Sequence, residues 1–163
     1  MKIYISPSDQ SANVGVGDYG TEADRMQELS DLLVPILKKS HTVYGGSNSI
    51  SLDSRIKASN DKNVDIHVAL HSNAGGGTGP ETWYYTDSAN GKKLAQAIQT
   101  ELEDLKGSGR GIKASTKYRE LNSTNAVAVL VEVAFHDNQS DATWMLDNWS
   151  KIAKAIADGI NAY

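Results

Sequence analysis

The chain has 163 residues, of which 39% are apolar and 22% charged, and its formal net charge is −4. This composition predicts one folded domain and excludes a disordered chain. The absence of cysteine excludes a disulfide framework and a thiolate metal site, and the negative charge offers no basic face to a nucleic acid.

The first half of the chain alternates between strand and helix patterns. A short strand is expected at residues 2–5, and a second at residues 41–45. Between them, Thr21 is expected to cap a helix. A short amphipathic helix is expected at residues 51–63, and residues 64–71, "VDIHVALH", read as a buried strand. The first helix repeats apolar residues at helical spacing: Met26, Leu29, Leu33, Ile36 and Leu37.

The second half continues the alternation. A strand at residues 79–86 precedes a helix at about residues 90–106. Residues 126–135, "AVAVLVEVAF", are typical of a strand covered on both faces, and a last helix follows at about residues 140–161. The pattern predicts an α/β fold in which residues 1–163 form a single domain. We expect a twisted, mostly parallel sheet of about six strands, flanked by helices on both faces.

Three polar residues are expected at one edge of this sheet. In open α/β sheets, functional sites gather beyond the carboxyl ends of the strands. His71 ends one predicted strand, Glu132 lies near the end of another, and Glu22 begins the first helix. A zinc hydrolase needs His or carboxylate ligands, an open position for water, and a free carboxylate to take a proton from that water.

Each of these residues also has a purely structural interpretation. Glu132 lies in an apolar strand, where it is either paired with an Arg or with backbone amides, or acts as a general base near a Lewis acid. His71 is either a hydrogen-bonding residue or a ligand, and Glu22 also suits a helix N-terminus by charge alone. His67 lies roughly 13 Å from His71 along the strand, so we expect it to be a histidine of the core or sheet face.

Several segments together resemble the zinc-dependent N-acetylmuramoyl-L-alanine amidases of the amidase-3 family. The resemblance runs nearly end to end and is carried by "GTEADRM", "SLDSRIKASN", "VDIHVALHSNAGG", "GPETWYY", "GRGIK" and "AVLVEVAFHDN". It implies that Glu22 and His71 bind zinc and that Glu132 is the catalytic base. The implied reaction is hydrolysis of the amide between N-acetylmuramic acid and L-alanine in bacterial peptidoglycan.

One departure from the family pattern concerns the third zinc ligand. Where the family has a His in a "GHGG" turn after the first strand, this chain reads "SPSDQS", with Asp9 at the position of the His. The ligand is then Asp9, or His136 from the loop after Glu132, or it has been lost. We favour His136, because imidazole suits zinc better than a third carboxylate does. Asn73 is expected either to contact the peptide or to serve only as a turn residue.

The leading hypothesis is therefore a zinc-dependent amidase acting on peptidoglycan. We expect it to be a monomer outside the cell or in the cell wall, either a phage endolysin or an exported autolysin. No apolar run approaches the roughly 20 residues that cross a bilayer, so we expect no membrane insertion. The alternatives are a catalytically inactive amidase-fold module that binds or regulates the wall, and a metallopeptidase that cleaves elsewhere in the stem peptide.

Overall fold

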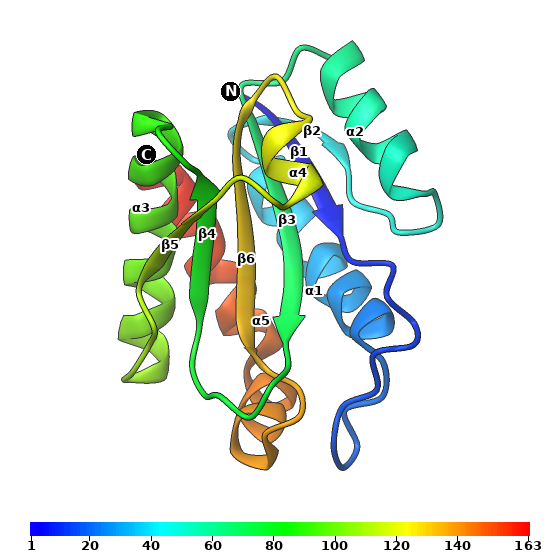
Figure 1. Cartoon of the computed structure of the whole chain (residues 1–163), viewed down its shortest axis with the longest axis vertical. Helices are drawn as coiled ribbons and strands as arrows, with labels where there is room; N and C mark the ends of the chain where they lie inside the picture. Colours follow the sequence, from blue (N-terminus) through cyan, green and yellow to red (C-terminus); the bar gives the residue numbers. More distant parts are fainter.

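Six strands form one sheet in the order β2-β1-β3-β6-β4-β5 (Figure 1) in the computed structural model, which describes residues 1–163. Neighbouring strands are parallel, except that β4 runs antiparallel to β6. The predicted α/β fold with a mostly parallel sheet is confirmed. The strands are β1 (Lys2–Pro7), β2 (Thr42–Gly45), β3 (Ile66–Asn73), β4 (Glu81–Tyr85), β5 (Ile112–Ser115) and β6 (Val127–Phe135).

Helices lie on both faces of the sheet. Three long helices pack against one face, and two short ones, α2 and α4, lie over the other (Figure 1). The short elements β5 and α4 have no counterpart among the expected elements. No helix combines the length and the apolar character that crossing a membrane requires. The helices are α1 (Glu22–Leu37), α2 (Leu52–Asp61), α3 (Ala89–Lys106), α4 (Arg119–Asn122) and α5 (Gln139–Ala162).

The two faces of β3 and β6 serve different purposes because side chains alternate along a strand. On β3, Ile66, Val68 and Leu70 enter a core cluster of 27 buried residues beneath α1, α3 and α5. The intervening residues emerge on the opposite face. The candidate site forms on that face. A smaller apolar cluster lies there beside the polar side chains and consists of Ala69, Leu121, Ala128 and Leu130.

Candidate active site

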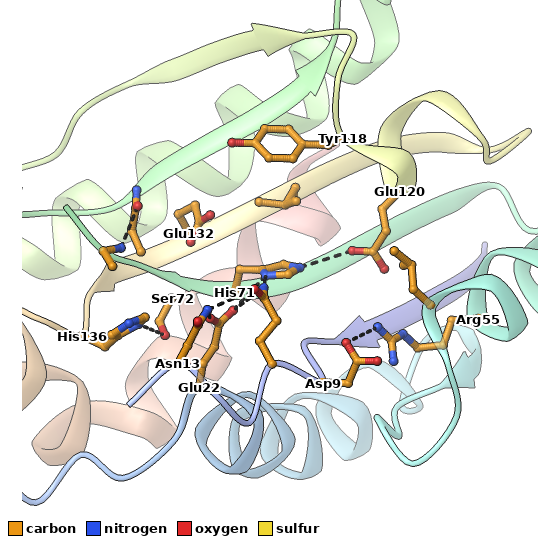
Figure 2. Close-up of a pocket in the computed structure, with 15 residues that line it drawn as sticks. Asp9, Asn13, Glu22, Arg55, His71, Ser72, Tyr118, Glu120, Glu132 and His136 are labelled. Atoms are coloured by element: carbon orange, nitrogen blue, oxygen red, sulfur yellow. Dashed lines mark hydrogen bonds and ion pairs between the residues drawn. The ribbon is translucent and has the colours of Figure 1, made fainter. Parts of the chain in front are cut away.

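His71 and Glu132 come together at the carboxyl ends of β3 and β6. These strands are parallel neighbours, and their register pairs His71 with Glu132. Both residues line a cavity of about 480 Å³, and Glu22 lines the same cavity from the first turn of α1. Figure 2 shows the three side chains around this cavity. The structure therefore places side by side three residues that lie far apart along the chain.

Glu22 is fixed at the N-terminus of α1, and its side chain is 1% exposed. Thr21 caps the helix by accepting a hydrogen bond from the backbone N–H of Asp24 at 3.1 Å. Asn13 Nδ2 donates to Glu22 Oε2 at 2.7 Å, and His71 Nδ1 lies 2.9 Å from Glu22 Oε1. Burial favours a higher pKa for Glu22, but the hydrogen bonds from His71 and Asn13 outweigh burial and lower the pKa. Glu22 is consequently an anion at neutral pH.

His71 lies between two buried carboxylates, one at each ring nitrogen. Its Nδ1 is 2.9 Å from Glu22 Oε1, and its Nε2 is 3.3 Å from Glu120 Oε2. Burial alone would lower the pKa of His71, but the hydrogen bonds to Glu120 and Glu22 raise the pKa to about 10. Each ring nitrogen of His71 thus has a carboxylate oxygen within hydrogen-bond distance.

Glu120, on α4, belongs to the site although the sequence analysis does not identify it. Its side chain is only 4% exposed. Besides contacting His71, Glu120 accepts a hydrogen bond from Ser6 Oγ, and its Oε1 lies 3.5 Å from His67 Nε2. Burial favours a higher pKa for Glu120, but the interactions with His67 and His71 hold the pKa well below its usual range. Its context, "KYRELNST", has no strand or helix periodicity, so only the tertiary structure reveals it.

Glu132 is the one carboxylate of the site that lacks a partner. Its Oε2 is shielded from solvent and has no hydrogen-bond partner. Burial raises the pKa of Glu132 to about 7, with the charge of His71 opposing the shift and the charge of Glu22 adding to it. A carboxyl group with a pKa near neutrality is suited to accept a proton and return it during a reaction.

His136 and Asp9, the two expected candidates for a third metal ligand, line the cavity but are engaged with other residues. His136 Nδ1 lies 2.8 Å from Ser72 Oγ, and Asp9 Oδ1 lies 3.2 Å from Arg55 Nη2 (Figure 2). The structure contains no group of three His, Cys, Asp or Glu residues arranged to hold a metal ion. In this conformation, neither candidate completes a set with the carboxylate and imidazole described above.

The side-chain amide of Gln10 adjoins both Glu22 and His71. Gln10 Nε2 is 3.2 Å from His71 Nδ1 and 3.4 Å from Glu22 Oε1. A carboxylate and an imidazole that face each other are a ligand pair typical of zinc sites. The oxygen and nitrogen of a Gln amide can also exchange places by rotation. These residues fit a divalent cation held by Glu22 and His71, and Gln10 is a further site residue that the sequence analysis does not identify.

Asn73 stands at the end of β3 and lines the same cavity. Its Nδ2 donates to Glu81 Oε1 at 2.9 Å, and its Oδ1 accepts from the backbone N–H of Ala74 at 2.8 Å. The side chain thus joins β3 to β4 and shapes the turn. Contact between Asn73 and a substrate stays a prediction.

A comparison with protein families finds that residues 3–162 match the amidase-3 family, described as N-acetylmuramoyl-L-alanine amidase. Among curated proteins, LytC of Bacillus subtilis, an N-acetylmuramoyl-L-alanine amidase, is 33% identical over 80% of this chain, which spans 27% of LytC. The uncharacterised protein YqiI of the same species is 31% identical over 99% of this chain and 84% of its own length.

Solved structures of similar fold include several amidase domains. The catalytic domain of CwlV from Bacillus (Paenibacillus) polymyxa has a TM-score of 0.89 at 23% identity, covering 99% of this chain and 97% of that domain. The catalytic domain of the CD27L endolysin, which targets Clostridium difficile, has a TM-score of 0.80 at 27% identity. The match covers 99% of this chain and 97% of that domain. The likeness to CwlV bears on the fold alone.

Proposed function

The chain belongs to the amidase-3 family, and we propose that it hydrolyses the amide bond between N-acetylmuramic acid and L-alanine in bacterial peptidoglycan. The observation that carries the proposal is the convergence of Glu22, His71 and Glu132 on one cavity. These are the residues to which the family resemblance assigns metal binding and proton transfer. We propose that the protein acts at the cell wall, where this substrate is found.

We propose zinc as the cofactor, with Glu22 and His71 as ligands. A bound zinc ion would supply Lewis acidity toward the scissile carbonyl and toward the attacking water. The carboxylate of Glu22 and Nδ1 of His71 face each other at 2.9 Å, and both adjoin the cavity that would admit the substrate. For the third ligand we keep His136, which would have to release Ser72, over Asp9, which would have to leave Arg55.

Glu132 is assigned the proton transfers. As a base, its carboxylate takes a proton from the attacking water while the C–N bond of the substrate is still intact. Its carboxylic acid then gives that proton to the nitrogen of L-alanine as the bond breaks, so that the amine leaves uncharged. The pKa of about 7 suits both directions of transfer, and Oε2 has no protein partner that would compete for the proton.

The substrate is expected to lie across two adjoining hollows. A second cavity of about 500 Å³ shares Tyr118 with the first, and its wall includes Trp83, whose ring meets that of Tyr118 edge-on at 5.3 Å between centroids. Aromatic faces of this kind suit sugar rings and peptide groups. Asn73, at the rim, is proposed to contact the peptide.

The proposed role of Glu132 is tested by Glu132→Gln. We expect the rate of wall hydrolysis to fall at least roughly 100-fold, because the amide cannot accept the proton. Zinc binding should stay at the parent level. The matched control is Glu28→Gln on the outer surface of α1, where the carboxylate pairs only with Arg25; it should hydrolyse walls at the parent rate. Lysis that survives in Glu132→Gln would remove Glu132 from this role.

The products separate the amidase from a metallopeptidase acting elsewhere in the stem peptide. An amidase releases a free amino group on L-alanine and a free lactyl carboxyl group on the glycan. A new amine on any other residue of the peptide would contradict the proposal.

An inactive wall-binding module is the second candidate, because no three-ligand cluster is present. Zinc content after purification without added metal distinguishes the two. About one zinc per chain supports the enzyme, whereas absence of zinc together with no lysis in zinc-supplemented buffer supports the module.

The third ligand is tested by comparing the zinc affinity of His136→Ala with that of Asp9→Ala. We expect zinc affinity to fall in His136→Ala.

A further inference from the structure

We propose that Glu120 is a positioning residue that holds Nε2 of His71 and thereby directs Nδ1 toward Glu22 and the cation. This inference rests on the proposed function, since it concerns the affinity of the same site for its metal. Glu120 lies on α4, a four-residue helix that no sequence pattern identifies.

His71 has a carboxylate on each side of its ring. The two nitrogens of an imidazole point in different directions, and a neutral ring that binds a metal through one nitrogen carries a proton on the other. Here Glu22 Oε1 faces Nδ1 at 2.9 Å, and Glu120 Oε2 faces Nε2 at 3.3 Å (Figure 2). A carboxylate acceptor at Nε2 fixes the proton there, sets the tilt of the ring and makes Nδ1 a better ligand.

The other contacts of the two carboxylates distinguish the ligand, Glu22, from the support, Glu120. Both oxygens of Glu120 are already engaged: Oε1 by the Ser6 hydroxyl and by proximity to His67, and Oε2 by His71. The partners of Glu22 besides His71 are amide side chains, which can turn or withdraw when a cation arrives. The cation therefore belongs on the Nδ1 side.

Glu120 is itself held in place by buried neighbours. Arg55, 2% exposed, donates from Nε to Ser6 Oγ at 3.0 Å and from Nη1 to the carbonyl oxygen of Ile50 at 2.7 Å. Ser6 in turn donates to Glu120. This chain of contacts runs from α2 through β1 to α4, and all of its side chains are buried. A rigid support of this kind is what restricts the orientation of a metal ligand.

The two histidines of β3 have different roles around Glu120. His67 and His71 project from the same face of the strand, and the carboxylate of Glu120 lies between their Nε2 atoms, at 3.5 Å and 3.3 Å. His67 Nδ1 is anchored 3.0 Å from Ser59 Oγ on α2. His67 thus contributes to the placement of Glu120, and only His71 faces the cation.

The test is the zinc affinity of the full chain, measured by competition with a chromophoric chelator. The variants are Glu120→Gln, which keeps the shape and one acceptor oxygen, and Glu120→Ala, which removes the acceptor. We expect affinity to fall roughly 10- to 100-fold in Glu120→Ala and by a smaller factor in Glu120→Gln. Zinc concentrations above the weakened dissociation constant should restore wall hydrolysis in both.

Asp141→Asn is the matched control, because Asp141 is also fully buried and ion-paired, to Lys106 at 2.9 Å, and touches no residue of the site. It should lower the temperature of unfolding without changing zinc affinity. A role for Glu120 in folding alone would give the same outcome in its variants: lower thermal stability and an affinity within twofold of the parent. That result, in either folded Glu120 variant, overturns the inference.

The parent titration keeps the two proposals separate. If the parent binds no zinc, the proposed cofactor fails and the role of Glu120 fails with it. If the parent binds zinc and the Glu120 variants bind it equally well, only the positioning role is rejected.

Discussion

Glu132 is a single residue whose burial lowers the stability of the folded protein when its carboxyl group is ionised. It lies on β6 between apolar residues, its Oε2 has no partner, and its pKa is raised to about 7. A carboxylate in such surroundings costs free energy when it ionises. That cost is useful only if the group exchanges protons during a reaction, which is the role proposed for it.

This cost predicts a pH-dependent stability difference between the zinc-free parent and Glu132→Gln. The carboxyl group releases its proton near pH 4.5 in the unfolded chain and near pH 7 in the folded chain. Between these values the folded state binds more protons, so the stability of the parent falls as the pH rises. The variant lacks this titration, and its stability relative to the parent should grow by about 3 kcal/mol from pH 4.5 to pH 8.

Urea unfolding of chelator-treated protein at several pH values measures the difference. The Glu28→Gln variant, changed at a surface ion pair, serves as the control and should show a pH-independent offset. A constant difference between Glu132→Gln and the parent across this range would mean that Glu132 has an ordinary pKa.

At the scale of elements, the fold depends on a close approach of α5 to α3. Gly159, on α5, faces the backbone of α3, and a Cβ atom placed on it would lie 2.6 Å from Ile98 Cα and 2.9 Å from the carbonyl oxygen of Ala97. Contacts this short involve backbone atoms, which cannot be relieved by turning a side chain. The two helices pack at this distance because residue 159 has no side chain.

We therefore expect Gly159→Ala to destabilise the protein by about 1–3 kcal/mol, although alanine is the better helix former by up to about 1 kcal/mol. Thermal or urea unfolding of Gly159→Ala and the parent measures whether the substitution lowers or raises stability. Lys151→Ala, at an exposed position of the same helix, should change stability by less than about 0.5 kcal/mol. A stabilised Gly159→Ala variant would show that α3 and α5 can separate without loss.

At the scale of the whole molecule, the proposed cation would connect layers that the sheet separates. Glu22 belongs to α1 on one face, whereas the side chain of His71 emerges on the other. The core of 27 residues includes neither of these two residues. The chain should therefore fold without metal, and metal should add stability by binding the folded state alone.

Zinc at about 100 times its dissociation constant should stabilise the chelator-treated protein by about 2.7 kcal/mol. For a chain of this length that corresponds to a rise in the unfolding temperature of roughly 5–10 °C. Calorimetry measures the rise, and circular dichroism should show a folded protein before zinc is added. Glu22→Gln and His71→Ala should each abolish most of the shift. An undiminished shift in these variants would place the zinc at another position on the chain.

The sequence by itself determined the fold class and most element positions, and it placed Glu22, His71 and Glu132 at one edge of the sheet. Alternating strand and helix periods predict the α/β sheet, because each period matches one way of burying an apolar face. Glu132 and His71 are recognisable because a charged or titratable residue in an apolar strand requires an explanation, and strand order places such residues at one edge. Glu22 joins them because it begins the first helix, and the family resemblance gives all three residues a chemical role.

Only the tertiary structure decided the partners of these residues. Glu120 and Gln10 lie in segments without periodicity, so nothing in the local sequence separates them from solvent-exposed polar residues. Their significance comes from contacts with His71 across 49 and 61 positions of sequence. Likewise Asp9 stands where the family has a His, yet its carboxylate pairs with Arg55. Burial and ion pairing depend on which segments, distant along the chain, come into contact. Those contacts are determined by the tertiary structure.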